Sequence, residues 1–89
     1  LMILTREQKA ELLEPYIETI KEARLQRGIS QARLATAADL SSKYVTLLES
    51  FKRVPTVECV VALAAKAGVP RATVENLMEE VLDHFEWEG

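Results

Sequence analysis

The stretch from Ser30 to Ser50, SQARLATAADLSSKYVTLLES, constrains the fold of this chain most strongly, because its helical pattern breaks near Asp39 and restarts at once. Ser30 is placed to cap a first helix of about two turns, and Ser41 is placed to cap a second one. Two helices joined by so few residues cannot continue one another, so the second crosses the first at a steep angle. The stretch predicts a helix-turn-helix.

The residues at the expected contact between these two helices are small or apolar. Gln31 opens the first helix, and Ala35 is small enough to let the two helices approach closely. Val45 and Leu48 are three residues apart on the second helix, a spacing that places both on one buried face. The serine and lysine end of the second helix is expected to face solvent.

The rest of the chain also repeats its apolar residues at spacings of three and four, which predicts an all-α fold. A short N-terminal helix is expected at about residues 5–13, and a new helix is expected to start at Pro15 and to close at Gly28. After the motif, one helix is capped by Thr56 and a last one follows Pro70. The prediction is a compact five-helix domain with an additional short N-terminal helix and an extended C-terminal helix.

Charge divides the chain into three parts. The chain has 89 residues, enough for one modest core, and its net charge is −3. Residues 1–14 carry −1, and residues 15–70 carry eight basic and five acidic groups, or +3. Residues 71–89 carry −5. We therefore expect an N-terminal helical extension (1–14), a mildly basic helix-turn-helix core (15–70) and an acidic C-terminal helix (71–89).

Several classes of protein are not expected. No apolar run is long enough to span a membrane, and LMILTREQK does not resemble a signal peptide, so a cytoplasmic location is expected. Cys59 is interpreted as a small buried residue, and His84 as a solvent-facing one with no His or Cys nearby. With no Gly-rich phosphate loop and no ligand cluster, we expect no enzyme activity, no metal site and no cofactor.

From about Ile20 to Val69 the chain resembles the Cro and phage-repressor type of helix-turn-helix domain, also called lambda repressor-like. The stretches RLQRGISQARLA, LSSKYVTLLES and KRVPTVECVVALAAKAGVP occur in the order and spacing of that family. The resemblance implies a mostly buried ion pair between Arg24 and Glu49. The family usually has Gly where this chain has Asp39, and Asp adopts the required left-handed backbone at a cost of about 1 kcal/mol relative to Gly.

The resemblance also implies sequence-specific binding of double-stranded DNA and regulation of transcription, with a repressor expected. In this family type the second helix of the motif enters the major groove. The residues implied to read bases are Ser41, Ser42, Lys43 and Leu47. Those implied to bind phosphates are Gln31, Arg33, Lys52 and Arg53. For Leu47 two alternatives stay open, a contact with a partner protein or a partly covered surface leucine.

A domain with so few base-reading groups needs two copies on a palindromic site, with half-sites about 34 Å apart, to discriminate usefully. The last helix is expected to supply the contact between the copies. Leu77 should close the core, and an apolar stripe continues beyond it as Met78, Val81, Leu82, Phe85 and Trp87. The alternative is that this stripe packs on the chain's own N-terminal helix through Leu12 and Leu13.

A different function competes with DNA binding. The same fold serves as a protein-interaction module, such as an antitoxin or a cofactor that bridges regulators, with the C-terminal helix as the surface for a protein partner. Net acidity, Leu47 and the apolar tail favour this hypothesis. The +3 charge of residues 15–70 and Lys43 near the start of the recognition helix favour DNA.

Overall fold

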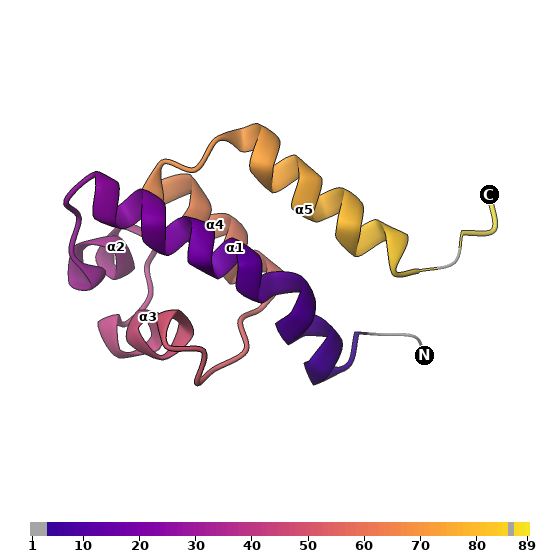
Figure 1. Cartoon of the computed structure of the whole chain (residues 1–89), viewed down its shortest axis with the longest axis horizontal. Helices are drawn as coiled ribbons and strands as arrows, with labels where there is room; N and C mark the ends of the chain where they lie inside the picture. The colour runs from indigo at the N-terminus through magenta and orange to yellow at the C-terminus, as the bar shows by residue number, and fades with distance from the viewer. Residues whose placement is uncertain (1–3, 86) are drawn as a thin grey trace.

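The computed structural model describes residues 4–85 and 87–89, and this part of the chain is built from helices without a strand (Figure 1). The all-α prediction is therefore confirmed, and the described chain contains five helices. None of these helices combines the length and the apolar character needed to cross a membrane. In chain order they are α1 (Arg6–Gln26), α2 (Gln31–Ala37), α3 (Ser42–Glu49), α4 (Val57–Ala67) and α5 (Arg71–Asp83).

The first helix differs from the prediction, because α1 runs through Pro15 without a break. Its start is as expected: Thr5 Oγ1 accepts the Gln8 N–H at 3.1 Å, and the Gln8 side chain accepts the Thr5 N–H at 2.8 Å. The expected separation into a helix at 5–13 and another from Pro15 is wrong. The N-terminal extension is instead the first part of α1, and Figure 1 shows that the helix axis bends in this half.

Burial on both sides of Pro15 explains why the helix continues. A proline removes one N–H and crowds the carbonyl four residues earlier, which costs about 3 kcal/mol in a helix interior. Leu12 and Leu13 lie before the proline, Ile17 and Ile20 lie after it, and all four are buried in the same core. Each fully buried aliphatic side chain contributes roughly 1.5–3 kcal/mol, so burial on both sides outweighs the local defect.

Helices α1 to α4 share one type of C-terminal end. After each helix one residue has a left-handed backbone, and the next residue donates its N–H to the carbonyl five positions earlier, at 2.8–3.0 Å. The left-handed backbone expected at Asp39 is confirmed, with φ of 58°. Phe51 has the same φ, which nothing in the sequence predicted. The four left-handed residues are Gly28, Asp39, Phe51 and Gly68.

The last helix is shorter than predicted, since α5 ends at Asp83 and does not reach Trp87. Two N–H groups donate to the carbonyl of Leu82 where the helix stops. It accepts the backbone N–H of Phe85 and the indole N–H of Trp87, both at 3.1 Å. The indole therefore adds a second donor to a carbonyl at the end of the helix, where intrahelical donors are lacking.

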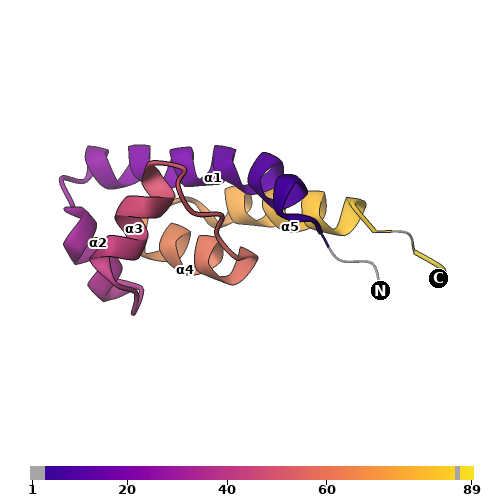
Figure 2. The same cartoon turned by 90° about the horizontal axis from the view of Figure 1, so that it is seen from below.

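The core is formed by one face of each helix, and Leu77 of α5 closes it as predicted, with no exposed surface. The molecule measures 44 × 26 × 19 Å. In Figures 1 and 2, α2 and α3 lie at one end of the long axis, and the first turn of α1 and the end of α5 lie toward the other. In these views neither the first turn of α1 nor the end of α5 lies over α3.

Candidate nucleic-acid interface

The N-terminal end of α3 presents polar side chains to solvent. Ser41 caps the helix, and its Oγ accepts the N–H of Tyr44 at 3.1 Å, so this hydroxyl is engaged by the protein. Ser42 and Lys43 follow on the first turn, and both are exposed. Val45 points the opposite way into the core and is 1% exposed. The predicted division of α3 into a buried face and an open polar face is what the structure contains.

A buried ion pair fixes the other end of α3. Arg24 of α1 donates from Nε and Nη2 to the two carboxylate oxygens of Glu49, each at 2.8 Å. Its Nη1 donates to the carbonyl of Ile29, also at 2.8 Å. The two charged side chains are only 8% and 5% exposed. This bidentate geometry holds α3 at a fixed angle to α1, because a planar guanidinium and a carboxylate match in one orientation.

Gln31 extends this ion pair into a network that joins α2 to α3. Its amide nitrogen donates to Glu49 Oε1 at 3.0 Å, and its amide oxygen accepts the Thr46 hydroxyl at 2.8 Å. Gln31 was predicted to bind phosphate, and the amide carries a second N–H that can still do so. Thr46 was missed from the sequence, because no spacing rule connects it with a residue on the preceding helix.

Beside the polar end of α3 lies a hollow of about 290 Å³, lined by Ser41, Lys43, Tyr44, Leu47 and Arg53. The guanidinium of Arg53 lies over the ring of Tyr44, 5.9 Å from its centre, within the range of a cation–π contact. Burial raises the pKa of Tyr44, so its hydroxyl is neutral at physiological pH. The structure thus brings Lys43 and Leu47, predicted to read bases, next to Arg53, predicted to bind phosphate.

The other predicted phosphate-binding cations are exposed. Arg33 lies on α2, and Lys52 follows α3. Within residues 4–85 and 87–89, the carboxylates that form ion pairs are those of Glu49 and Glu75, and neither one pairs with these cations. Their charge is therefore not neutralised by a salt bridge in the described part of the chain.

The predicted dimerisation residues are divided between the core and the surface. Val81 packs partly against the core, to which Leu12 and Leu13 also belong. Met78 and Leu82 are 39% and 44% exposed. Phe85 is partly buried, and Trp87 is 71% exposed. Between α4 and α5 an apolar groove of about 420 Å³ is lined mainly by Val61, Ala65, Val69, Val74 and Met78.

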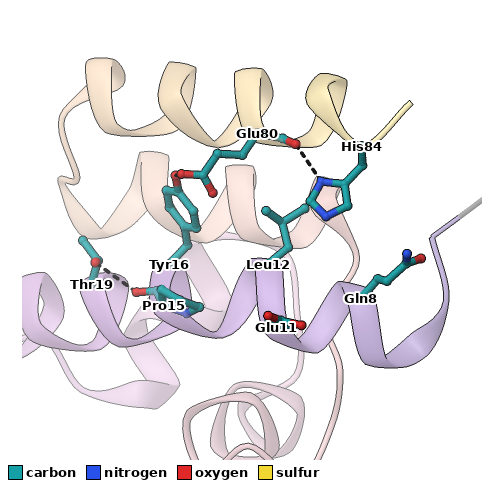
Figure 3. Close-up of a pocket in the computed structure, with 8 residues that line it drawn as sticks. All are labelled: Gln8, Glu11, Leu12, Pro15, Tyr16, Thr19, Glu80 and His84. Atoms are coloured by element: carbon teal, nitrogen blue, oxygen red, sulfur yellow. Dashed lines mark hydrogen bonds between the residues drawn. The ribbon is translucent and has the colours of Figure 1, made fainter. Parts of the chain in front are cut away.

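A cleft of about 540 Å³ lies between α1 and the C-terminal part of α5 (Figure 3). Tyr16 donates its hydroxyl to Glu80 at 3.1 Å, and burial together with this bond raises the pKa of Tyr16. The ring of His84 lies 2.9 Å from the carbonyl of Glu80, and Figure 3 shows Leu12 directed toward α5 beside it. These contacts fix one side of α5 on α1 and leave its apolar edge with Met78 and Leu82 open.

Two short helices at a tight turn, supported by three others and with one open polar helix end, define the helix-turn-helix class of domain. A comparison with protein families agrees, since the family HTH_3, described as helix-turn-helix, matches residues 20–73. The chain belongs to this family of lambda repressor-like DNA-binding regulators, as the stretch from Ile20 to Val69 predicted. No match was found among curated proteins or solved structures.

Proposed function

We propose that this protein is a sequence-specific regulator of transcription that represses as a homodimer on a palindromic DNA site. One observation carries the proposal: α3 is held by a buried network at Glu49, and its opposite, polar end is open and lies beside uncompensated cations. A preorganised recognition helix loses little conformational freedom when it enters the major groove.

The first turn of α3 supplies the groups for base recognition. Lys43 can donate to O6 and N7 of guanine, and Ser42 can donate or accept. Leu47 lies one turn later, is half-buried in the hollow with Arg53, and offers an apolar contact such as a thymine methyl group. A short reading surface of this kind suits a few base pairs per subunit.

Phosphate contacts supply most of the affinity. Gln31, Arg33, Lys52 and Arg53 surround the motif, and each is at least partly exposed. The acidic C-terminal part of the chain lies at the opposite end of the molecule in Figures 1 and 2, where it does not oppose the DNA. Binding is therefore expected to weaken steeply as salt rises, because each neutralised phosphate releases counterions.

The homodimer forms through the open edge of α5. Met78 and Leu82 are exposed apolar side chains, and the groove beside Met78 is apolar along both α4 and α5. Large exposed apolar patches on small soluble domains mark interaction surfaces. A second copy of the chain supplies the same patch, as the two-fold symmetry of a palindromic site requires.

The proposal is tested by selecting duplexes from a random pool and measuring their binding by fluorescence anisotropy at about 50 mM and 200 mM salt. We expect an enriched palindrome, bound more tightly than bulk DNA, with affinity that falls strongly between the two conditions. The competing function is a protein-interaction module, favoured by the exposed apolar edge of α5. It predicts no enriched sequence and no salt-dependent binding to any duplex, a result that would reject our proposal.

A further inference from the structure

A basic hollow lies between the start of α1 and the loop that follows α3, and it shares Arg53 with the hollow beside the polar end of α3. It has a volume of about 380 Å³, and its charged lining consists of Arg6 and Lys9 from α1 and Arg53 from the loop. Arg6 and Arg53 are exposed, and Lys9 is half-buried. Val54, Pro55 and Thr56 complete the lining.

The positive charge of this hollow is not compensated locally. Its lining contains no Asp or Glu. In the described part of the chain, the cations found in ion pairs are Arg24 and Arg71, and neither one lies in the hollow. Three cations that converge without a carboxylate create a potential that attracts an anion from solution.

The basic hollow is continuous with the surface that reads bases. Arg53 lines both hollows, with Lys43 on one side and Lys9 and Arg6 on the other. In Figures 1 and 2 the loop after α3 lies between α3 and the first turns of α1. A track of positive charge therefore runs from the recognition helix toward the N-terminal extension.

The unbroken α1 is what places Arg6 and Lys9 on this track. The extension continues the helix through Pro15, with Leu12 and Leu13 anchored in the core, so its cations are held at a defined position. A small-anion site would need buried polar groups, whereas every polar residue that lines this hollow is at least partly exposed. An open groove of exposed cations instead fits an extended, repeating anion.

We propose that Arg6 and Lys9 bind backbone phosphates of the duplex that flank the base pairs read by α3. This inference rests on the proposed function and adds to it a second role for the N-terminal extension, which enlarges the footprint of each subunit. The two residues position the protein on the DNA and carry no base preference.

The test compares the double variant Arg6→Gln/Lys9→Gln with the control Lys66→Gln, which removes an exposed cation of α4 that lines neither hollow. Binding to the selected palindrome, within a duplex of about 30 base pairs, is measured over a range of salt concentrations. A plot of log affinity against log salt has a negative slope, and each lost phosphate contact makes this slope shallower by about 0.9. We expect the slope to become shallower by roughly 2 per subunit in the double variant and to change little in the control.

Two further measurements make the result specific. The charge-preserving variant Arg6→Lys/Lys9→Arg should keep the wild-type slope, and the double variant should keep the wild-type order of preference among sequences. An unchanged slope and affinity in Arg6→Gln/Lys9→Gln, with normal binding by the wild type, would overturn this inference and leave the proposed function standing. Wild-type protein that binds no duplex would overturn both.

Discussion

At the scale of single residues, the orientation of α3 depends on a buried carboxylate that accepts three hydrogen bonds. Glu49 accepts two from Arg24 and one from Gln31, and every bond is 3.0 Å or shorter. No buried side-chain nitrogen or oxygen in the described residues lacks a partner. A fully satisfied ionic network inside a low-dielectric region specifies one arrangement, because any other leaves a charge unpaired.

We predict that Arg24→Met lowers the free energy of unfolding by about 3–5 kcal/mol, because the carboxylate of Glu49 stays buried without its counterion. Denaturant unfolding measures this loss. The control is Arg71→Met, which breaks an exposed ion pair with Glu75, and it should change stability little.

The double variant Arg24→Met/Glu49→Met separates the charge effect from lost packing. It should recover much of the stability, since apolar residues tolerate this environment once both charges are gone. A single variant Arg24→Met that unfolds like the wild type would contradict the account of how α3 is held.

At the scale of helices, α5 has two sides with different roles. One side contributes Leu77 and Val81 to the core and joins α1 through the bond between Tyr16 and Glu80. The other side carries Met78 and Leu82 to solvent. Part of the apolar stripe is thus used within the chain, and the remainder is available to a second copy.

We predict that Leu82→Lys converts the proposed dimer to a monomer, because a charged side chain would be buried at the contact between two copies. Sedimentation equilibrium measures the change, and Leu25→Lys is the matched control. Leu25 is 57% exposed on α1, outside the proposed contact, so its replacement should leave the dimer intact. A Leu82→Lys protein that sediments as the wild type does would place the dimer contact elsewhere.

Local chemistry made the helix starts and the motif predictable from the sequence. The caps at Ser30, Ser41 and Thr56 follow from one side chain and the N–H groups beside it, and each is present. Pro15 misled the prediction because its effect depends on the burial of residues on both sides, which the local sequence does not contain. The bond between Gln31 and Thr46 likewise depends on how two helices meet.

At the scale of the whole molecule, the proposed DNA contact on α3 and the proposed dimer contact on α5 lie apart along its 44 Å length. The helix-turn-helix occupies one end, and the end of α5 lies toward the other (Figures 1 and 2). This arrangement keeps the negative charge of residues 71–89 away from the recognition helix. It also allows α5 to join two copies without covering α3.

The central claim is that α3 reads bases in the major groove, and dimethyl sulfate protection tests it most directly, because the reagent modifies guanine N7 in that groove. With the selected palindrome, we expect the wild type to protect two sets of guanines whose centres lie about 10 base pairs apart. Lys43→Ala should remove this protection at the guanine it contacts. Tight binding of the wild type without protection of any guanine N7 would contradict the account.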